Sequence, residues 1–164
     1  MILDASAILA VLLREPGCEG LLRHIAESPV VAAGAPTLLE AALVLSSRMR
    51  RNAGVLLNEF LREADVEIIS FTRDHYEVAV DAFERYGKGR HSAALNFGDC
   101  MTYAVARISG MPLLFTGRDF SKTDILRAQS MGIGRPKGFG DKCSTYPECL
   151  GARGFPPGSP PSKK

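Results

Sequence analysis

The chain has 164 residues, 46% hydrophobic and 23% charged, a composition that fits one globular domain and excludes a fibrous or fully disordered chain. Its four cysteines form no C-x-x-C pair and no zinc-type spacing with the three histidines, so we do not expect a zinc knuckle. We expect Cys18 and Cys100 to be small apolar residues of a reduced, cytoplasmic protein.

The net charge of +2 is unevenly distributed along the chain. From residue 132 onward, six basic and two acidic residues give +4, which leaves −2 on residues 1–131. Residues 132–164 are rich in Gly, Pro, Lys and Arg without apolar periodicity, so we expect a disordered tail after one domain over residues 1–131. Because the domain is mildly acidic, a general basic surface would not explain nucleic-acid binding.

The first half of the chain alternates short apolar strands with helices. We expect a strand at "MIL", helices over "SAILAVLLR" and "CEGLLRHIAE", and a buried strand at "VVAAG". Pro36 marks the start of a helix that runs to about residue 51, and Gly54 separates it from the helix "VLLNEFLREA", which predicts a helical hairpin. The run "SAILAVLL" lacks a basic leader and follows Asp4, so we expect no signal peptide.

The second half continues this alternation. "VEIISF" and "PLLFT" predict strands, and "TRDHYEVAVDAFERYG" and "GDCMTYAVARISG" predict helices. A last short helix, "TDILRAQ", follows the capping box "SKTD" with Ser121 as N-cap. Four strands alternating with helices predict an α/β fold with a mainly parallel sheet covered on both faces. No segment approaches the roughly 20 apolar residues that span a bilayer.

Four acids are expected at the carboxyl edge of this sheet, where ligands gather in open parallel folds. Asp4 directly follows the first strand, and Asp119 lies three residues after the last. Glu40 lies near the start of the helix after the second strand, and Asp99 opens a helix. Taken singly, Asp4 and Asp99 also fit N-caps, and Asp119 also fits a turn.

Clustered carboxylates repel one another unless a cation compensates them. Mg²⁺ takes one or two carboxylates and keeps several waters, which can attack a phosphodiester. The pattern therefore indicates metal-dependent phosphodiester hydrolysis. Ser6, Thr116 and Asn96 are suited to hydrogen-bond the carboxylates or metal waters, although Asn96 also fits a turn-shaping role.

Three segments carry a resemblance to a known family: "MILDASAILAVLLREP", "LLEAALVL" and "LNFGDCMTYAVARISGMPLLFTGRDFSKTDI". Over about residues 1–131 they resemble PIN-domain ribonucleases of the VapC toxin type, and the tail has no counterpart. The resemblance implies a PIN-like three-layer sandwich with a mainly parallel four- to five-stranded sheet and helices on both faces. It also implies cleavage of RNA with Mg²⁺ or Mn²⁺, inhibition by a VapB-like antitoxin, and a homodimer. The family's metal-binding acids correspond to Asp4 and Asp99, with Glu40 and Asp119 completing the site and Ser6 at its Ser/Thr position.

Two surfaces are candidates for binding partners. Basic side chains beside the acids are expected to hold RNA phosphates, although each alone fits an ordinary surface charge: Lys88, Arg90, Arg118 and Lys122. The hairpin of residues 36–64 carries more apolar side chains than a small sheet covers, including Leu56, Leu57, Phe60 and Leu61. They either pack within the hairpin or receive an apolar helix of the antitoxin.

Other readings of the first acid are weaker. A haloacid-dehalogenase phosphatase needs a second Asp where Ser6 stands, and a dinucleotide binder needs a Gly-rich turn that "DASAILA" lacks. The strongest alternative is a catalytically silent module that only binds RNA or an antitoxin.

Overall fold

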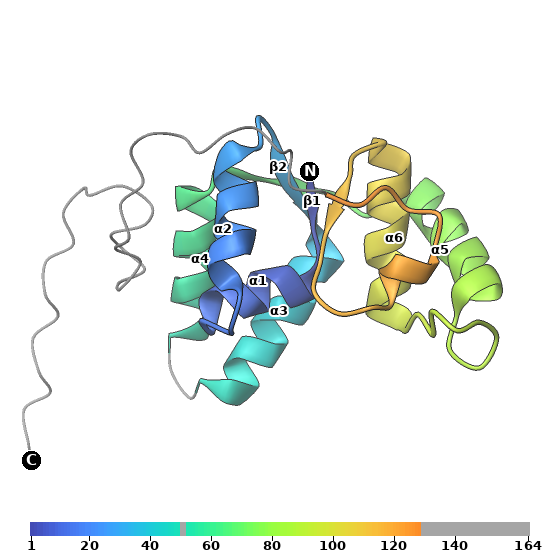
Figure 1. Cartoon of the computed structure of the whole chain (residues 1–164), viewed down its shortest axis with the longest axis horizontal. Helices are drawn as coiled ribbons and strands as arrows, with labels where there is room; N and C mark the ends of the chain where they lie inside the picture. The colour runs from blue at the N-terminus through green and yellow to red at the C-terminus, as the bar shows by residue number, and fades with distance from the viewer. Residues whose placement is uncertain (50–51, 129–164) are drawn as a thin grey trace, which may run out of the picture. The chain divides into compact units, whose positions relative to one another are not determined.

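The computed structural model describes residues 1–49 and 52–128, so the expected tail over residues 132–164 lies outside the described residues. The strands in the described part form one parallel sheet in the order β3-β2-β1-β4 (Figure 1). They are β1 (Ile2–Leu3), β2 (Val31–Gly34), β3 (Val66–Ile69) and β4 (Leu113–Leu114). Ile2 pairs with Ala32 on one side and Leu113 on the other, which makes β1 a central strand. The predicted parallel α/β sheet is confirmed.

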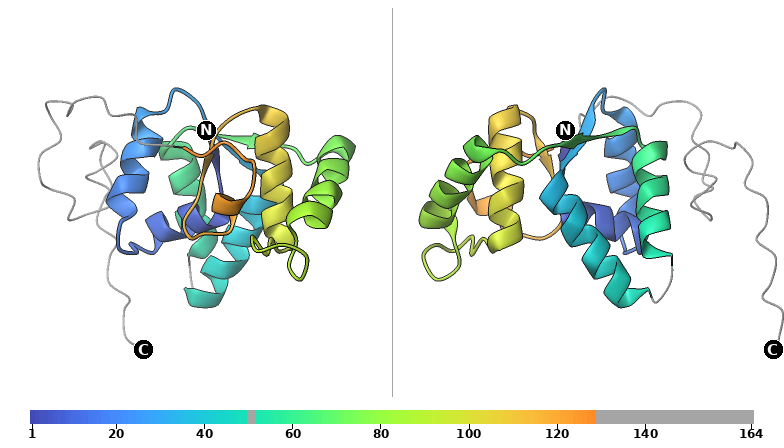
Figure 2. Two further views of the ribbon diagram at one scale, coloured as in Figure 1. Left: turned by 45° about the vertical axis from the view of Figure 1, so that its right-hand side comes forward. Right: turned by 180° about the vertical axis from the view of Figure 1, so that it is seen from behind.

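The helices cover both faces of this sheet. Those described are α1 (Ala5–Leu12), α2 (Cys18–Glu27), α3 (Ala35–Arg48), α4 (Ala53–Glu63), α5 (Arg73–Tyr86) and α6 (Phe97–Ser109). Helices α1, α2 and α4 lie to one side of the sheet and α5 and α6 to the other (Figure 2). Helix α3 continues from β2 and contacts α1, α4 and α6, so it joins the two helical layers. None of the described helices is long and apolar enough to cross a membrane.

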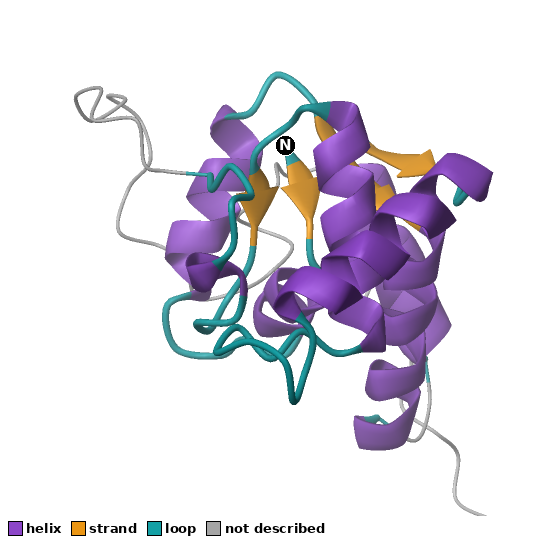
Figure 3. Ribbon diagram, turned by 90° about the vertical axis from the view of Figure 1, so that its right-hand side faces the viewer, coloured by secondary structure: helices purple, strands orange, loops and turns teal. Residues whose placement is uncertain are grey.

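The end of the described domain differs from the sequence prediction. The expected helix "TDILRAQ" is absent from the described residues, where a 3-10 turn, η1 (Phe120–Lys122), is followed by an extended segment. Leu113 N–H donates to the Leu126 carbonyl at 2.8 Å, and Ala128 N–H donates to the Leu113 carbonyl at 2.9 Å. The segment thus lies alongside β4 and pairs with it through a single parallel β-bridge between Leu113 and Arg127; β4 itself runs parallel to β1 (Figure 3).

Two predicted helix boundaries are wrong. Gly54 lies inside α4, and the break before that helix occurs at Asn52, which has a left-handed φ of 69°. Ser121 is not an N-cap, because it lies inside η1 and no helix follows it among the described residues; its hydroxyl donates to the Arg118 carbonyl. Thr72 is the N-cap of α5, and His75 completes its capping box.

The hairpin of α3 and α4 is confirmed, and of the four apolar residues expected there, Leu56 and Leu61 are half-buried. Leu57 and Phe60 are buried, so these two pack within the domain. Its exposed apolar surface comes instead from Leu39, Leu43 and Val55. The two cysteines are buried as predicted, and burial raises the pKa of the Cys100 thiol to about 11.

Candidate active site

Asp4 lies at the carboxyl end of β1 and caps α1. Its side chain is almost fully buried, and its Oδ2 accepts hydrogen bonds from the Ser6 backbone N–H at 2.9 Å and from the Ser6 hydroxyl at 2.5 Å. The Ser6 Oγ in turn accepts a bond from the Thr116 N–H at 3.0 Å, which ties the start of α1 to the end of β4. Thr116 therefore supports Asp4 through its backbone. Within the described residues no hydrogen bond reaches Asp4 Oδ1, so this oxygen is available to a ligand.

Asp99 occupies the third position of α6 and does not cap it. The N-cap is Asn96, whose Oδ1 accepts from the Asp99 N–H at 3.0 Å. Asp99 Oδ2 accepts from the Asn96 N–H at 2.8 Å, completing a reciprocal capping box. Helix α6 therefore begins two residues before Asp99, at Phe97, and the alternative in which Asp99 is its N-cap is wrong. Asn96 both shapes the turn and orients this carboxylate.

Glu40 reaches the first turn of α6 from the neighbouring helix α3. A Cβ placed on Gly98 would lie 2.4 Å from Glu40 Oε2 and 3.0 Å from Oε1. The carboxylate therefore sits where a side chain on residue 98 would be. The sequence analysis missed Gly98, although a glycine directly before an acid in a helical first turn is a signal for close approach. One turn further along, the buried hydroxyls of Thr37 and Thr102 lie 2.9 Å apart and join the same two helices.

The four acids share an electrostatic environment. Burial raises the pKa of Glu40, and the charges of Asp4 and Asp99 raise it further. Burial also raises the pKa of Asp99, against the opposing effect of the Asn96 N–H, and Asp4 and Asp119 add to the rise. Among the described residues, none of the four forms an ion pair with Lys, Arg or His. The cluster therefore carries negative charge without a protein counter-ion.

The donor chemistry of the cluster suits a hard divalent cation. All of its charged donors are carboxylate oxygens, and their mutual repulsion is relieved when a cation binds. Within the described part of the chain, no group of three or more His, Cys, Asp or Glu side chains is placed to hold a metal ion by itself. An ion that takes one or two carboxylates and keeps its waters, which is the preference of Mg²⁺, fits this donor set.

Asp119 and the predicted basic residues are all exposed. Asp119 is exposed, in the loop between β4 and η1, and it interacts with Asp99 through charge. Lys88, Arg90 and Arg118 are also exposed, and the Arg90 guanidinium lies 5.5 Å from the centre of the Phe83 ring.

Lys122 is exposed but already has a structural contact. Its ammonium donates to the Ser92 carbonyl at 2.6 Å and so connects η1 to the loop after α5. RNA binding by the predicted basic side chains remains a prediction.

Comparison with known proteins agrees with this architecture. Residues 1–126 match the PIN domain family. The chain is 42% identical over 125 residues to a ribonuclease VapC of Mycolicibacterium smegmatis, an alignment that covers 76% of this chain and 97% of the relative. Its fold is similar to the crystal structure of VapC20 of Mycobacterium tuberculosis, a Sarcin-Ricin loop cleaving toxin, with 22% identity, a TM-score of 0.63, and coverage of 76% and 95% of the two chains. A chain of a toxin-antitoxin complex from Klebsiella pneumoniae is similar at 16% identity with a TM-score of 0.57, over 75% of this chain and 92% of that one. The chain therefore belongs to the VapC ribonucleases of the PIN domain family.

Proposed function

We propose that the chain is a metal-dependent endoribonuclease toxin whose active site consists of Asp4, Glu40, Asp99 and Asp119. The observation that carries this proposal is that four carboxylates from separate segments of the chain repel one another at one site and form no ion pair among the described residues. Such a cluster opposes folding, and its most direct use is to bind a cation.

Each side chain has a role that follows from its contacts. Asp4 and Asp99 each use one oxygen for local hydrogen bonds and keep the other for the ion, so these two residues would hold it directly. Mg²⁺, or Mn²⁺ in its place, would supply an ionised water and neutralise charge at the scissile phosphate. Glu40, whose pKa is raised, is suited to accept a proton from the attacking water. Ser6 and Asn96 orient the two ligands, and Asp119 adds charge at the exposed side.

Mutation of the two proposed ligands tests this assignment. Asp4→Asn and Asp99→Asn keep the side-chain size and remove the charge, so Mg²⁺-dependent cleavage of a structured RNA should fall by at least about 100-fold. Asp74→Asn is the matched control, since Asp74 is an exposed acid in the first turn of another helix, α5. Undiminished cleavage by Asp99→Asn would refute the site. Wild-type protein that binds RNA with Mg²⁺ but never cleaves it would favour the silent binding module.

The exposed apolar side chains of the α3–α4 hairpin and the acid cluster are the surfaces expected to bind an antitoxin. We expect a VapB-like antitoxin to place an apolar helix on the exposed side chains of the α3–α4 hairpin, Leu39, Leu43 and Val55. An Arg of that antitoxin would compete with the cation for the acids. The similarity to a chain of a toxin-antitoxin complex supports such a partner. We also expect a homodimer acting on RNA in the cytoplasm, which light scattering and localisation would test.

A further inference from the structure

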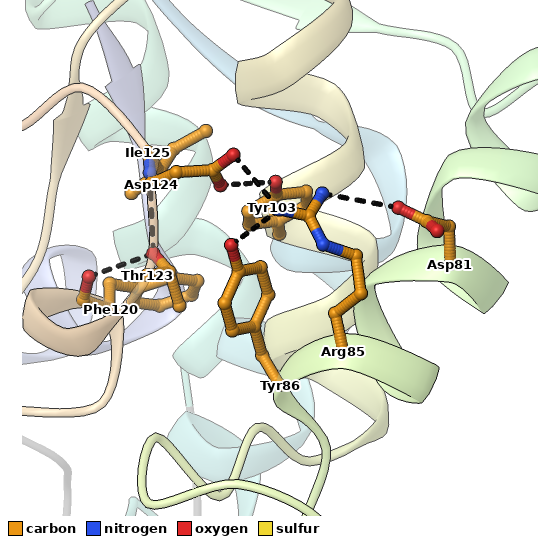
Figure 4. A network of polar contacts seen from close by, with 8 residues as sticks. All are labelled: Asp81, Arg85, Tyr86, Tyr103, Phe120, Thr123, Asp124 and Ile125. Carbon is orange, nitrogen blue, oxygen red and sulfur yellow. Dashed lines mark hydrogen bonds and ion pairs between the residues drawn. The ribbon is translucent and has the colours of Figure 1, made fainter.

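A second cluster of ionisable side chains surrounds Asp124, which is not one of the four acids of the proposed site (Figure 4). The Tyr103 hydroxyl donates to Asp124 Oδ1 at 2.6 Å, and Arg85 Nη2 donates to Asp124 Oδ2 at 3.2 Å. Arg85 also donates to the Tyr86 hydroxyl at 2.7 Å and to Asp81 at 3.4 Å. Asp124 is therefore the point at which the segment after η1 is attached to both α5 and α6.

The two helical partners of Asp124 lead back to the active site. Tyr103 lies one turn after Asp99 on α6, so its hydroxyl bond fixes the segment to the helix that carries an acid. On the other side, Asp124 follows Asp119 by five residues. Between them, Phe120 is 2% exposed and packs edge-on against Phe115, with ring centres 5.2 Å apart.

The residues that precede this anchored segment are held by few contacts: the Ser6 Oγ accepts from the Thr116 N–H, and the Arg118 carbonyl accepts from the Ser121 N–H and hydroxyl. Residues 116–119 are exposed, and within the described part of the chain no hydrogen bond or ion pair holds the Asp119 side chain. The position of Asp119 is therefore set by what holds the residues on either side of it. On one side is the Ser6 contact with the Thr116 N–H; on the other are Phe120, the bond from Lys122 to the Ser92 carbonyl, and Asp124.

We propose that Asp124 is a positioning residue that holds the Asp119 loop against the acid cluster through its bond to Tyr103. The inference rests on the proposed function in that Asp119 is taken to act in the active site. The ion pair with Arg85 is partly exposed, so solvent screens it, and the bond from the buried Tyr103 carries most of the attachment. That bond, ahead of the one from Arg85, also lowers the pKa of Asp124 and keeps it ionised.

Amide hydrogen exchange on the metal-free full-length chain tests the attachment without relying on catalysis. Asp124→Asn and the milder Tyr103→Phe should speed exchange of the hydrogen-bonded amides on either side of Asp119, those of Thr116 and of residues 121–123, by about tenfold, while amides of α1 and α3 stay unchanged. Asp81→Asn is the matched control, because it removes the other carboxylate that Arg85 contacts and leaves the segment untouched. Unchanged exchange at Thr116 and at residues 121–123 in both variants would overturn the proposal.

Cleavage then separates positioning from general stability. Asp124→Asn should lower the RNA cleavage rate about 10- to 100-fold, since displacing a catalytic group by about 1 Å has an effect of that size. In an Asp119→Asn background the same substitution should change the residual rate by less than about threefold. Equal losses in both backgrounds would show that Asp124 does not act through Asp119. If the wild-type chain cleaves no RNA, the proposed function fails, and the exchange result alone decides the attachment.

Discussion

Replacing Gly98 with Ala should separate activity from stability in this protein. The new Cβ would lie 2.4 Å from Glu40 Oε2 and 2.9 Å from its Cδ, whereas ordinary contacts begin at 3.4 Å. The carboxylate therefore has to retreat by about 1 Å, the difference between 3.4 and 2.4 Å. A displacement of about 1 Å in a catalytic group lowers rates by about 100-fold, or about 2.7 kcal/mol in the barrier.

The same substitution should not destabilise the fold. Gly98 does not have a left-handed φ, so Ala adopts its backbone conformation without strain. Ala in place of Gly in a helix adds about 0.5–1 kcal/mol to the free energy of unfolding. The atoms that must move are at the end of a flexible side chain, which turns away at little cost. We therefore expect an unfolding free energy that is unchanged or up to about 1 kcal/mol higher.

The assay pairs urea unfolding with Mg²⁺-dependent cleavage of RNA. Gly54→Ala is the matched control, since Gly54 is also the second residue of a helix and an added Cβ there meets nothing within 4 Å. Shortening the displaced side chain with Glu40→Asp should restore part of the activity lost in Gly98→Ala. If Gly98→Ala cleaves RNA within about threefold of Gly54→Ala, the close approach has no part in catalysis.

Three further predictions follow from the charges and surfaces. In the metal-free protein the pKa values of Glu40 and Asp99 are raised above their ordinary values of 4.5 and 3.8. The protonated carboxyls therefore stabilise the fold at pH values below these ordinary values, and the stabilisation is lost as the pH rises through the raised pKa values of the folded state. Asp99→Asn should flatten that dependence in urea unfolding, and a slope equal to wild type would count against it. Alanine at Lys88 and Arg90 should weaken RNA binding and reduce the slope of log affinity against log salt concentration by about 1.4, while a dinucleotide is still cleaved. An unchanged slope would show that these two side chains do not bind phosphates. A co-expressed antitoxin should slow hydrogen exchange in residues 36–64, and protection of an unrelated face alone would exclude that surface.

The acids could be found from the sequence because their neighbours are local. Asp4 follows a strand directly, and the carboxyl ends of parallel strands meet at one edge. Asp99 was predicted in the correct helix, but its exact position in that helix depends on Asn96, which also favours an N-cap. Asn96 is the N-cap because its amide oxygen accepts from the Asp99 N–H while the Asp99 carboxylate accepts from the Asn96 N–H.

The contacts that the sequence could not reveal are those between distant segments. The pattern "SKTD" predicted a local capping box, yet Asp124 bonds Tyr103 and Arg85, which lie 21 and 39 residues away along the chain. The expected final helix failed for the same reason, because Ile125 packs into the core and the neighbouring backbone pairs with Leu113. Tertiary partners thus overrode local propensity where the chain returns to the sheet.

The arrangement of these distant contacts explains how the domain tolerates a cluster of acids. Elements that carry a repelling carboxylate are joined nearby by a hydrogen bond between neutral groups. Thr37 and Thr102 join α3 and α6 at three residues from Glu40 and Asp99, and the Ser6 hydroxyl receives the Thr116 N–H beside Asp4. Hydrogen bonds between neutral groups do not weaken when the acids ionise, whereas ion pairs to the acids would occupy the oxygens that a cation needs. The fold can therefore keep the carboxylates close together before the ion binds, and cation binding has only to relieve their repulsion.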